Sequence, residues 1–388
     1  MEARGAAHPA VRILDDLVRI QSVNPHYGAD ARGERDVADY IEARLLRAGL
    51  QVTRQPVADG RDNIIAELRV GKPESALLFE AHMDTVSIGS MRDALVPTYR
   101  EGRLYGRGAC DTKGALAGMI HMMERCAQHP ERLNADLVFC ASVDEEHAFI
   151  GLTAFMSLNM PISGAVVGEP TELGIVVEHK GCTRFAVRTH GKSAHSSVPH
   201  KGDNAIYAMM DVVRHVRETV EPGLDGIDSP LCGKPTIVVS TIGGGSQINI
   251  VPETCDIRVD RRIVPGESAE AVLADFERRM KTDLPHLELT VNPLLLDPAL
   301  NTPHDAEVVQ AAQSVASRLG MNKSLRGVTY GSNASKLQDW KGIPAIVFGP
   351  GSIEQAHSAE EYVPVSEVVQ AAEFYYQLAC SYTAGQKE

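Results

Sequence analysis

The chain has 388 residues, enough for two domains of ordinary size with well-buried cores. Hydrophobic residues make up 44% and charged residues 23%, which is typical of a soluble globular protein. A formal net charge of -13 argues against nucleic acid and against an anionic membrane surface as partners.

No stretch reaches the roughly 18–20 apolar residues of a transmembrane helix. The first twenty residues predict an amphipathic helix interrupted by charges, not a signal peptide. Seven cysteines lie far apart without a CxxC pair, which favours free thiols in a reducing compartment. We therefore expect a cytoplasmic protein with no membrane partner.

The first part of the chain, up to about residue 174, alternates between helix-like and strand-like segments. Its short continuous apolar runs are typical of strands buried on both faces of a sheet. The pattern predicts an α/β domain with a mostly parallel sheet and helices on both faces. The main predicted elements are a helix over 34–49, a strand over 75–84, a helix over 112–126 and a strand over 135–144.

The pattern changes near Ile175 and returns near Asn301. The intervening segments predict a smaller α+β domain of ferredoxin-like type, whose edge strands and amphipathic helix need cover from a second subunit. They are a strand pair over 174–191, a helix over 203–220, strands over 235–245 and 253–264, a helix over 267–280 and a strand over 286–292.

After the insert, the first pattern predicts a helix over 305–320, a buried strand over 343–351 and a closing helix over 365–380. We therefore predict a discontinuous α/β domain over 1–177 and 293–388. The second domain, over 178–292, interrupts it.

Polar side chains follow the predicted buried strands, at the edge where open α/β sheets place their ligands. In "FEAHMDTV", His82 and Asp84 point the same way along an extended segment, so Asp84 can orient one ring nitrogen and leave the other for a metal. A solvated polar turn is the alternative. Asp111 in "YGRGACDTKG" precedes a helix and could merely cap it. The glycine spacing there fits neither common phosphate-loop motif.

Three consecutive acids, Asp144, Glu145 and Glu146, follow the strand over 135–144. The first turn of a helix would accommodate one or two of them through the macrodipole. In the alternative, Glu146 is a metal ligand and Glu145 is a general base for water. Asp144 would then only cap the turn, and His147 has no assigned role.

Two further strand ends complete a candidate ligand set. Glu169 follows the apolar run of "VVGEPTE", and His357 follows the predicted strand over 343–351. Two imidazoles and three carboxylates without a thiolate suit zinc, with manganese and cobalt as alternatives. A bridging carboxylate would hold two ions about 3.5–4 Å apart. The five candidate ligands are His82, Asp111, Glu146, Glu169 and His357.

These motifs resemble the M20 metallopeptidases and deacylases, the group of acetylornithine deacetylase, succinyl-diaminopimelate desuccinylase and carboxypeptidase G. The matching stretches run in family order from residue 82 to residue 364, so the resemblance covers nearly the whole chain. They are "HMD", "GRGACD", "DEE", "GEP", "GKSAHSSVP", "QINIVPE" and "AHSAEEYVP".

The resemblance implies that Asp111 bridges two divalent ions. It implies that His82 and Glu169 complete the shell of one ion, and that Glu146 and His357 complete the shell of the other. By the same resemblance, Asp84 would orient His82. Glu145 would take a proton from the bridging water and pass it to the leaving nitrogen.

In the insert, His195 is either an ordinary surface histidine or, by the resemblance, the residue that reaches the partner subunit's active site and stabilises the oxyanion. Asn249 matches a residue near the substrate carbonyl. Arg262 resembles the arginine that binds the substrate carboxylate, since a guanidinium suits that role. Arg258 and Arg261 are rivals, and on a strand Arg258 and Arg262 face the same side.

One position departs from the family. Many relatives have an aspartate where this chain has Asn333, in "YGSNAS". This position is not among the matched ligands, so we expect the metal shell to be intact. We expect the change to affect recognition of the leaving end of the substrate.

The sequence therefore predicts a homodimeric, dinuclear metal-dependent hydrolase of the amide bond in a small N-acyl amino acid. A carboxypeptidase or dipeptidase of the same family is the first alternative. A non-catalytic binding protein on this fold is a remote one, because all five ligands and Glu145 are present.

Overall fold

The computed structural model describes residues 8–28, 31–71 and 76–383, so the predicted start of the first helix, residues 1–7, lies outside the described residues. The chain divides into two compact units. The first comprises residues 1–177, 302–326 and 332–388, and the second comprises 178–301 and 327–331. The sequence pattern predicted that the insert ends at 292, whereas its last strand, β12, continues from Glu288 to Asp297.

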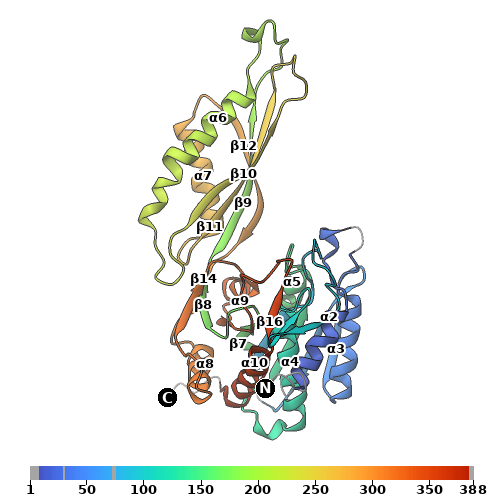
Figure 1. Cartoon of the computed structure of the whole chain (residues 1–388). Coiled ribbons are helices and arrows are strands. Elements are labelled where there is room, and N and C mark those ends of the chain that lie inside the picture. The colour runs from blue at the N-terminus through green and yellow to red at the C-terminus, as the bar shows by residue number, and fades with distance from the viewer. Residues whose placement is uncertain (1–7, 29–30, 72–75, 384–388) are drawn as a thin grey trace. The chain divides into compact units, whose positions relative to one another are not determined.

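The first unit is built on a mixed sheet whose four central strands are parallel (Figure 1). Each central strand is short and almost wholly buried, as the continuous apolar runs predict. An antiparallel hairpin forms one edge. In spatial order the strands are β1 (Gln51–Ala58), β2 (Arg61–Leu68), β6 (Leu137–Ser142), β3 (Ala76–His82), β7 (Ile162–Val167), β15 (Ala345–Val347), β8 (Ile175–His179) and β13 (Leu300–Asn301), and β14 (Leu325–Val328) pairs with β8.

Helices cover both faces of this sheet, as the α/β pattern predicts. The Phe79 ring packs against Tyr375 on one face, whereas the next side chain, Glu80, accepts a hydrogen bond from Asn333 on the other face. The first face carries α2 (Pro9–Arg19), α3 (Arg35–Arg47), α4 (Lys113–Gln128), α8 (Glu307–Arg318) and α10 (Val365–Ser381); the second carries α5 (Ile150–Ser157) and α9 (Asn333–Lys341).

A small antiparallel sheet lies beside this core. It orders β16 (Tyr362–Pro364), β5 (Arg103–Tyr105) and β4 (Thr98–Arg100), with Tyr362 paired to Tyr105. These pairs bring the segment after residue 357 next to the glycine-containing stretch 106–111. The two stretches are more than 240 residues apart in sequence.

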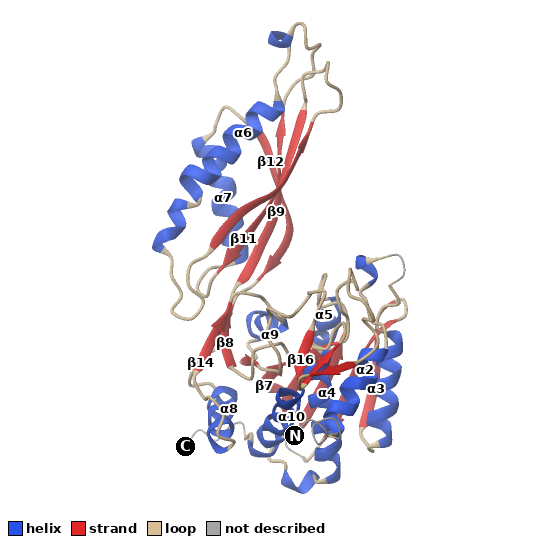
Figure 2. Ribbon diagram, in the orientation of Figure 1, coloured by secondary structure: helices blue, strands red, loops and turns tan. Residues whose placement is uncertain are grey.

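The second unit is an antiparallel sheet with two helices packed on one face (Figure 2). Its chain order of strand, helix, two strands, helix and strand is that of a ferredoxin-like domain. The strands are β9 (Gly181–His190), β10 (Thr236–Gly244), β11 (Thr254–Ile263) and β12, and the helices are α6 (Ala205–His215) and α7 (Ala269–Asp283).

The predicted strand pair over 174–191 is wrong. Both strands exist, but β8 pairs with β15 and β13, whereas β9 pairs with β11 and β12. Only Lys180 separates β8 from β9, which is too short a connection for the two-residue turn of a hairpin. Alternation of side chains identified the strands but not their partners.

All seven cysteines are free thiols, as predicted. Among the described residues, no helix combines the length and the apolar character needed to cross a membrane.

Candidate metal centre

Four side chains from or beyond strands of the first unit gather around a fifth, the carboxylate of Asp111. His82 is the last residue of β3, Glu169 lies two residues beyond β7, and Glu146 follows β6. Two groups of potential ligand atoms form, each with its atoms within 4.8 Å of one another. One group contains His82, Asp111 and Glu169, and the other contains Asp111, Glu146 and His357.

Asp111 offers a different oxygen to each imidazole. Its Oδ1 lies 3.2 Å from His82 Nε2, and its Oδ2 lies 3.2 Å from His357 Nε2. Glu169 Oε1 lies 3.8 Å from the His82 nitrogen, and Glu146 Oε1 lies 3.2 Å from the His357 nitrogen. A carboxylate that faces two ligand groups in this way has the geometry of a bridging ligand.

The ring of His82 is oriented from its far side. Its Nδ1 lies 2.9 Å from the backbone carbonyl oxygen of Asp84 and 3.5 Å from the Asp84 carboxylate. The nearer partner is thus the main chain, whereas the i, i+2 pattern predicted the side chain. Either contact places the Nδ1 proton away from the cluster, so Nε2 faces Asp111.

The Asp84 carboxylate also holds the loop that carries the neighbouring acids. It accepts hydrogen bonds from the backbone N–H of Glu145 at 3.1 Å and of Glu146 at 3.2 Å. The Asn24 side chain donates to it at 2.8 Å. Burial alone would raise the pKa of Asp84, but hydrogen bonds from His82 and Asn24 hold it below its usual value.

The acidic triplet does not lie in the first turn of a helix, because α5 begins only at Ile150. Asp144 has a left-handed φ of 67° and is buried. Arg61 forms an ion pair with its Oδ1 at 2.9 Å. The Asp144 carboxylate also accepts a hydrogen bond from the Ala148 N–H at 3.2 Å, so the predicted capping contact exists. The buried ion pair with Arg61 gives Asp144 a second structural role in addition to capping.

Burial of so many carboxylates changes their protonation. Burial raises the pKa of Glu145 to about 8, and burial together with the Asp111 charge raises the pKa of Glu169 well above its ordinary value. Hydrogen bonds to Asp111 and Glu146 raise the pKa of His357 to about 10. In the protein alone, protons on these groups therefore supply the positive charge that the carboxylates require.

The donor set fits a pair of borderline or hard divalent cations. Oxygen and imidazole nitrogen suit zinc, cobalt and manganese. Cys110 precedes Asp111, but its thiol donates to the carbonyl oxygen of Ser352 at 3.3 Å. Burial raises the pKa of the Cys110 thiol well above its ordinary value, so it is not a thiolate ligand.

Glu361 is a residue of the centre that the sequence analysis did not identify. Its carboxylate accepts from the backbone N–H groups of Gly108, Cys110 and Asp111, each at 3.0 Å. Arg107 Nη1 donates to it at 2.6 Å, and both side chains are buried. Glu361 thus fixes the backbone of the segment that presents Asp111.

The lysine of the "GRGACDTKG" stretch has a structural role. Lys113 is 1% exposed and its Nζ donates to the carbonyl oxygens of Leu17 at 3.0 Å and Ile20 at 2.7 Å. Burial lowers its pKa to about 7. These contacts agree with the conclusion from spacing that the stretch is not a phosphate loop.

The predicted oxyanion residues lie in the second unit, on neighbouring exposed loops. Ser196 N–H donates to the Asn249 carbonyl oxygen at 3.0 Å, and His195 forms a bridge with Ile250. His195 Nδ1 lies 2.8 Å from Ser197 Oγ. Within this unit the chain therefore brings His195 and Asn249 together.

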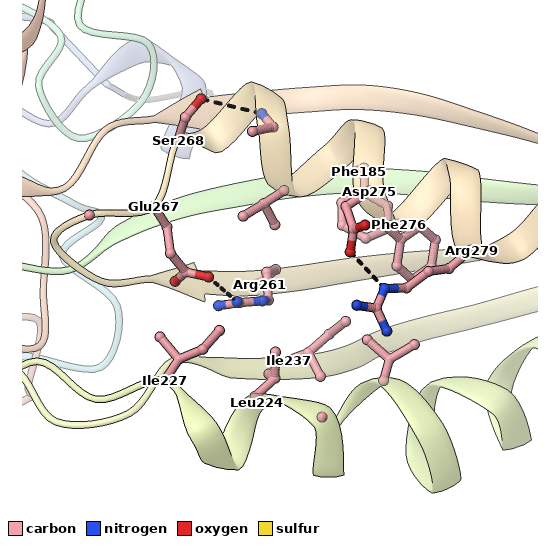
Figure 3. Close-up of a pocket in the computed structure, with 15 residues that line it drawn as sticks. Phe185, Leu224, Ile227, Ile237, Arg261, Glu267, Ser268, Asp275, Phe276 and Arg279 are labelled. Atoms are coloured by element: carbon pink, nitrogen blue, oxygen red, sulfur yellow. Dashed lines mark hydrogen bonds and ion pairs between the residues drawn. The ribbon is translucent and has the colours of Figure 1, made fainter.

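The structure separates the three candidate arginines. Arg261 faces the helices and is 4% exposed, and its guanidinium pairs with Glu267 at 2.6 Å. Figure 3 shows this pair in the wall of a cavity of about 320 Å³. Arg258 is exposed and Arg262 is partly exposed on the other face of β11, where Arg262 pairs with Asp260 at 2.9 Å. Burial and ion pairing therefore remove Arg261 from the candidates.

Asn333 lies at the start of α9, where it is 1% exposed and donates to Glu80 Oε1 at 3.0 Å. Ser142 Oγ donates to the same oxygen at 2.5 Å. Burial raises the pKa of Glu80. An aspartate at position 333 would place a second carboxylate against this one, so the amide avoids a buried repulsion.

The sequence of this chain is similar to those of known proteins. The model of "Peptidase family M20/M25/M40" matches residues 78–381. An acetylornithine deacetylase from Myxococcus xanthus is 33% identical over 380 residues, which cover 93% of this chain and 94% of that protein.

Two solved structures share the fold. A tripeptidase from Staphylococcus aureus superposes with a TM-score of 0.77 at 21% identity, over 96% of this chain and 97% of that chain. A dinuclear metal-binding M20 peptidase from Bacillus subtilis gives a TM-score of 0.73 at 15% identity, over 98% of this chain and 97% of that chain.

The Glu361→Ala variant should lose stability and metal together. Removal of the carboxylate leaves the buried Arg107 charge unpaired, which costs about 3–5 kcal/mol, and frees the backbone before Asp111. Urea unfolding and metal content measure the two effects. The neighbouring Glu360 is exposed and provides the control, since Glu360→Ala should change neither. Unchanged metal content in Glu361→Ala would contradict this role.

The metal-stripped protein should lose stability as the pH rises. The folded-state pKa of His357, about 10, lies above its ordinary value of 6.5, and that of Glu145, about 8, lies above 4.5. Stability from His357 is complete below pH 6.5 and is lost towards pH 10, and the Glu145 contribution falls between pH 4.5 and 8.

Urea unfolding of chelator-treated protein between pH 6.5 and 10 measures this loss. Metal-replete protein should show a flatter profile, because bound cations replace the protons. Buried Lys113, whose pKa is lowered to about 7, gains stability over the same range in both forms, so the two profiles are compared with each other. A difference between them that does not widen with pH would show that these groups do not carry protons there.

Proposed function

The chain belongs to peptidase family M20/M25/M40 and is a hydrolase of that family, and on this basis we propose that it is a dinuclear metal-dependent amidohydrolase of N-acyl amino acids. The observation that carries the proposal is the position of Asp111 between two ligand groups, with the partly buried Glu145 next to Glu146 in the chain. The family includes both deacylases and peptidases by name, so membership alone does not select the substrate class.

The ligand assignment follows the two groups of side chains. Asp111 would contact both ions, His82 and Glu169 would hold one of them, and Glu146 and His357 would hold the other. Divalent ions bound there, zinc with cobalt and manganese as alternatives, polarise the amide carbonyl and lower the pKa of water. The Bacillus subtilis relative is described as dinuclear, which supports a pair of ions.

Glu145 is the general base. Its backbone N–H is fixed by the Asp84 carboxylate, and its side chain is not among either group of ligand atoms. Burial raises the pKa of Glu145 to about 8, so its ionised carboxylate is a stronger base, which can accept a proton from the attacking water and pass it to the leaving nitrogen. Asp84 has a positioning role, because it holds both His82 and the Glu145 backbone.

Residues of the second unit act on the substrate. His195 and Asn249 donate to the oxygen of the reacting carbonyl, where negative charge develops. We assign His195 to the active site of the other subunit of a homodimer, as the family resemblance implies. Arg262, with Arg258 as the rival, binds the substrate carboxylate, and support comes from the place of both on the face of β11 opposite Arg261.

Removal of an N-acyl group from an amino acid is the preferred reaction. The support is the acetylornithine deacetylase that matches 93% of this chain. A carboxypeptidase or dipeptidase activity is the second candidate, because the solved tripeptidase shares the fold.

The free thiols agree with a cytoplasmic location.

The Glu145→Gln variant should keep its metal and lose its activity. The amide has nearly the same shape but cannot accept the proton, so kcat should fall by about 100- to 10,000-fold. Glu146→Gln, one residue along, should instead lose bound metal. Steady-state kinetics and metal content on both variants separate the roles. Normal turnover by Glu145→Gln would show that another group is the base.

A substrate panel should show preference for N-acyl amino acids. N-acetyl, N-succinyl and N-formyl amino acids, N-acetylornithine among them, are compared with dipeptides and tripeptides by kcat/KM. We expect the acyl amino acids to be the better substrates. A higher kcat/KM for peptides would favour the second candidate, and no turnover of any amide by metal-replete protein would contradict both.

A further inference from the structure

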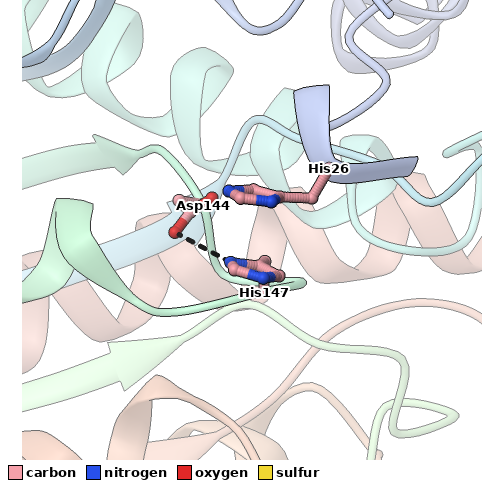
Figure 4. A group of neighbouring side chains, drawn as sticks. All are labelled: His26, Asp144 and His147. Atoms are coloured by element: carbon pink, nitrogen blue, oxygen red, sulfur yellow. Dashed lines mark ion pairs between the residues drawn. The ribbon is translucent and has the colours of Figure 1, made fainter. Parts of the chain in front are cut away.

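Two histidines form a second polar cluster that shares no side chain with the dinuclear centre. His26 lies in the short helix η1 (Pro25–Tyr27), and His147 follows Glu146 in the loop after β6. Their imidazole rings stack with centroids 3.5 Å apart and an angle of 6° between the planes. Figure 4 shows both rings ending beside the carboxylate of Asp144.

The two oxygens of Asp144 have different neighbours. Its Oδ1 accepts from Arg61 and from Asn24, both at 2.9 Å. Its Oδ2 accepts from the Ala148 N–H at 3.2 Å and lies 4.0 Å from His147 Nδ1. Potential ligand atoms of the three residues lie within 4.8 Å of one another. The Asp144 carboxylate is 1% exposed, whereas the His147 side chain is 40% exposed, so solutes can reach the cluster from solvent.

We propose that His26, Asp144 and His147 bind a third divalent transition-metal ion, of the zinc class. Two imidazoles and one carboxylate are a common ligand set for such ions, and water completes the shell. Because the rings are parallel, the lone pairs of their nitrogens point in parallel directions. Each ring must therefore tilt towards the ion before both nitrogens can bind it. Both imidazoles belong to exposed residues, which leaves room for that tilt.

A small anion is the less suitable ligand for this cluster. The buried Asp144 carboxylate lies at the end of the rings where their nitrogens meet, and its charge repels an anion there. A cation satisfies the carboxylate and both imidazoles together. The chemistry of the donors therefore favours the metal.

The third ion would tie two segments of the first unit together. His147 belongs to the loop of Glu145 and Glu146, and the Tyr27 hydroxyl, next to His26, already donates to the Glu146 carbonyl oxygen. An ion held by His26 and His147 adds a second link between the same segments. Because an ion that binds only the folded chain stabilises it, occupancy should raise the melting temperature.

Metal content after equilibrium dialysis against zinc tests the proposal. Wild type should hold three equivalents, whereas His26→Ala and His147→Ala should each hold two. The exposed His286 in the second unit is the matched control, and His286→Ala should retain three. Two equivalents in wild type, three in either cluster variant, or two in the control would each overturn the proposal.

Thermal unfolding provides a second readout on the same proteins. Addition of zinc beyond two equivalents should raise the melting temperature of wild type and of His286→Ala, but not of His26→Ala or His147→Ala. An equal rise in all four proteins would show that the ion binds elsewhere. Both measurements count or sense bound metal and not turnover, so they stand apart from the test of Glu145 as the base.

Discussion

The first unit is organised by one electrostatic constraint, the burial of three carboxylates around a single point. Asp111, Glu146 and Glu169 are brought within reach of one another and of two imidazoles. An ionised carboxylate taken out of water costs several kcal/mol unless an opposite charge accompanies it. Protons on the histidines supply that charge in the protein alone, and the pair of divalent cations that we propose would supply it at higher density.

The fold meets this constraint with rigid supports for each carboxylate-bearing segment. Parallel strands end at one edge of the sheet and deliver side chains from distant parts of the chain. Glu361 holds the backbone before Asp111, and Asp84 holds His82 together with the loop of Glu145. The Arg61–Asp144 ion pair fixes the base of that same loop. Buried polar contacts of this kind locate the ligands more exactly than apolar packing could.

Much of this arrangement could be predicted from sequence, because it follows from periodicity. Continuous apolar runs predicted the parallel strands, and polar residues beyond the strands predicted the five candidate ligands that the structure brings together. The strand partners of β8 and β9 could not be predicted, since alternation reports which face a residue occupies and not which strand lies beside it. Glu361 was missed because two glutamates adjoin in "AEEYVP", and only the pairing of β16 with β5 decides which one is buried. Arg261 was distinguished from its neighbours for the same reason, by the face of β11 on which it lies.

The proposed position of Asp111 between two cations can be tested by anomalous diffraction from zinc-loaded crystals, recorded on both sides of the zinc absorption edge. We expect two peaks about 3.5–4 Å apart, one beside His82 and Glu169 and the other beside Glu146 and His357, with Asp111 in contact with both. A single peak in this region, or two peaks of which only one contacts Asp111, would contradict it.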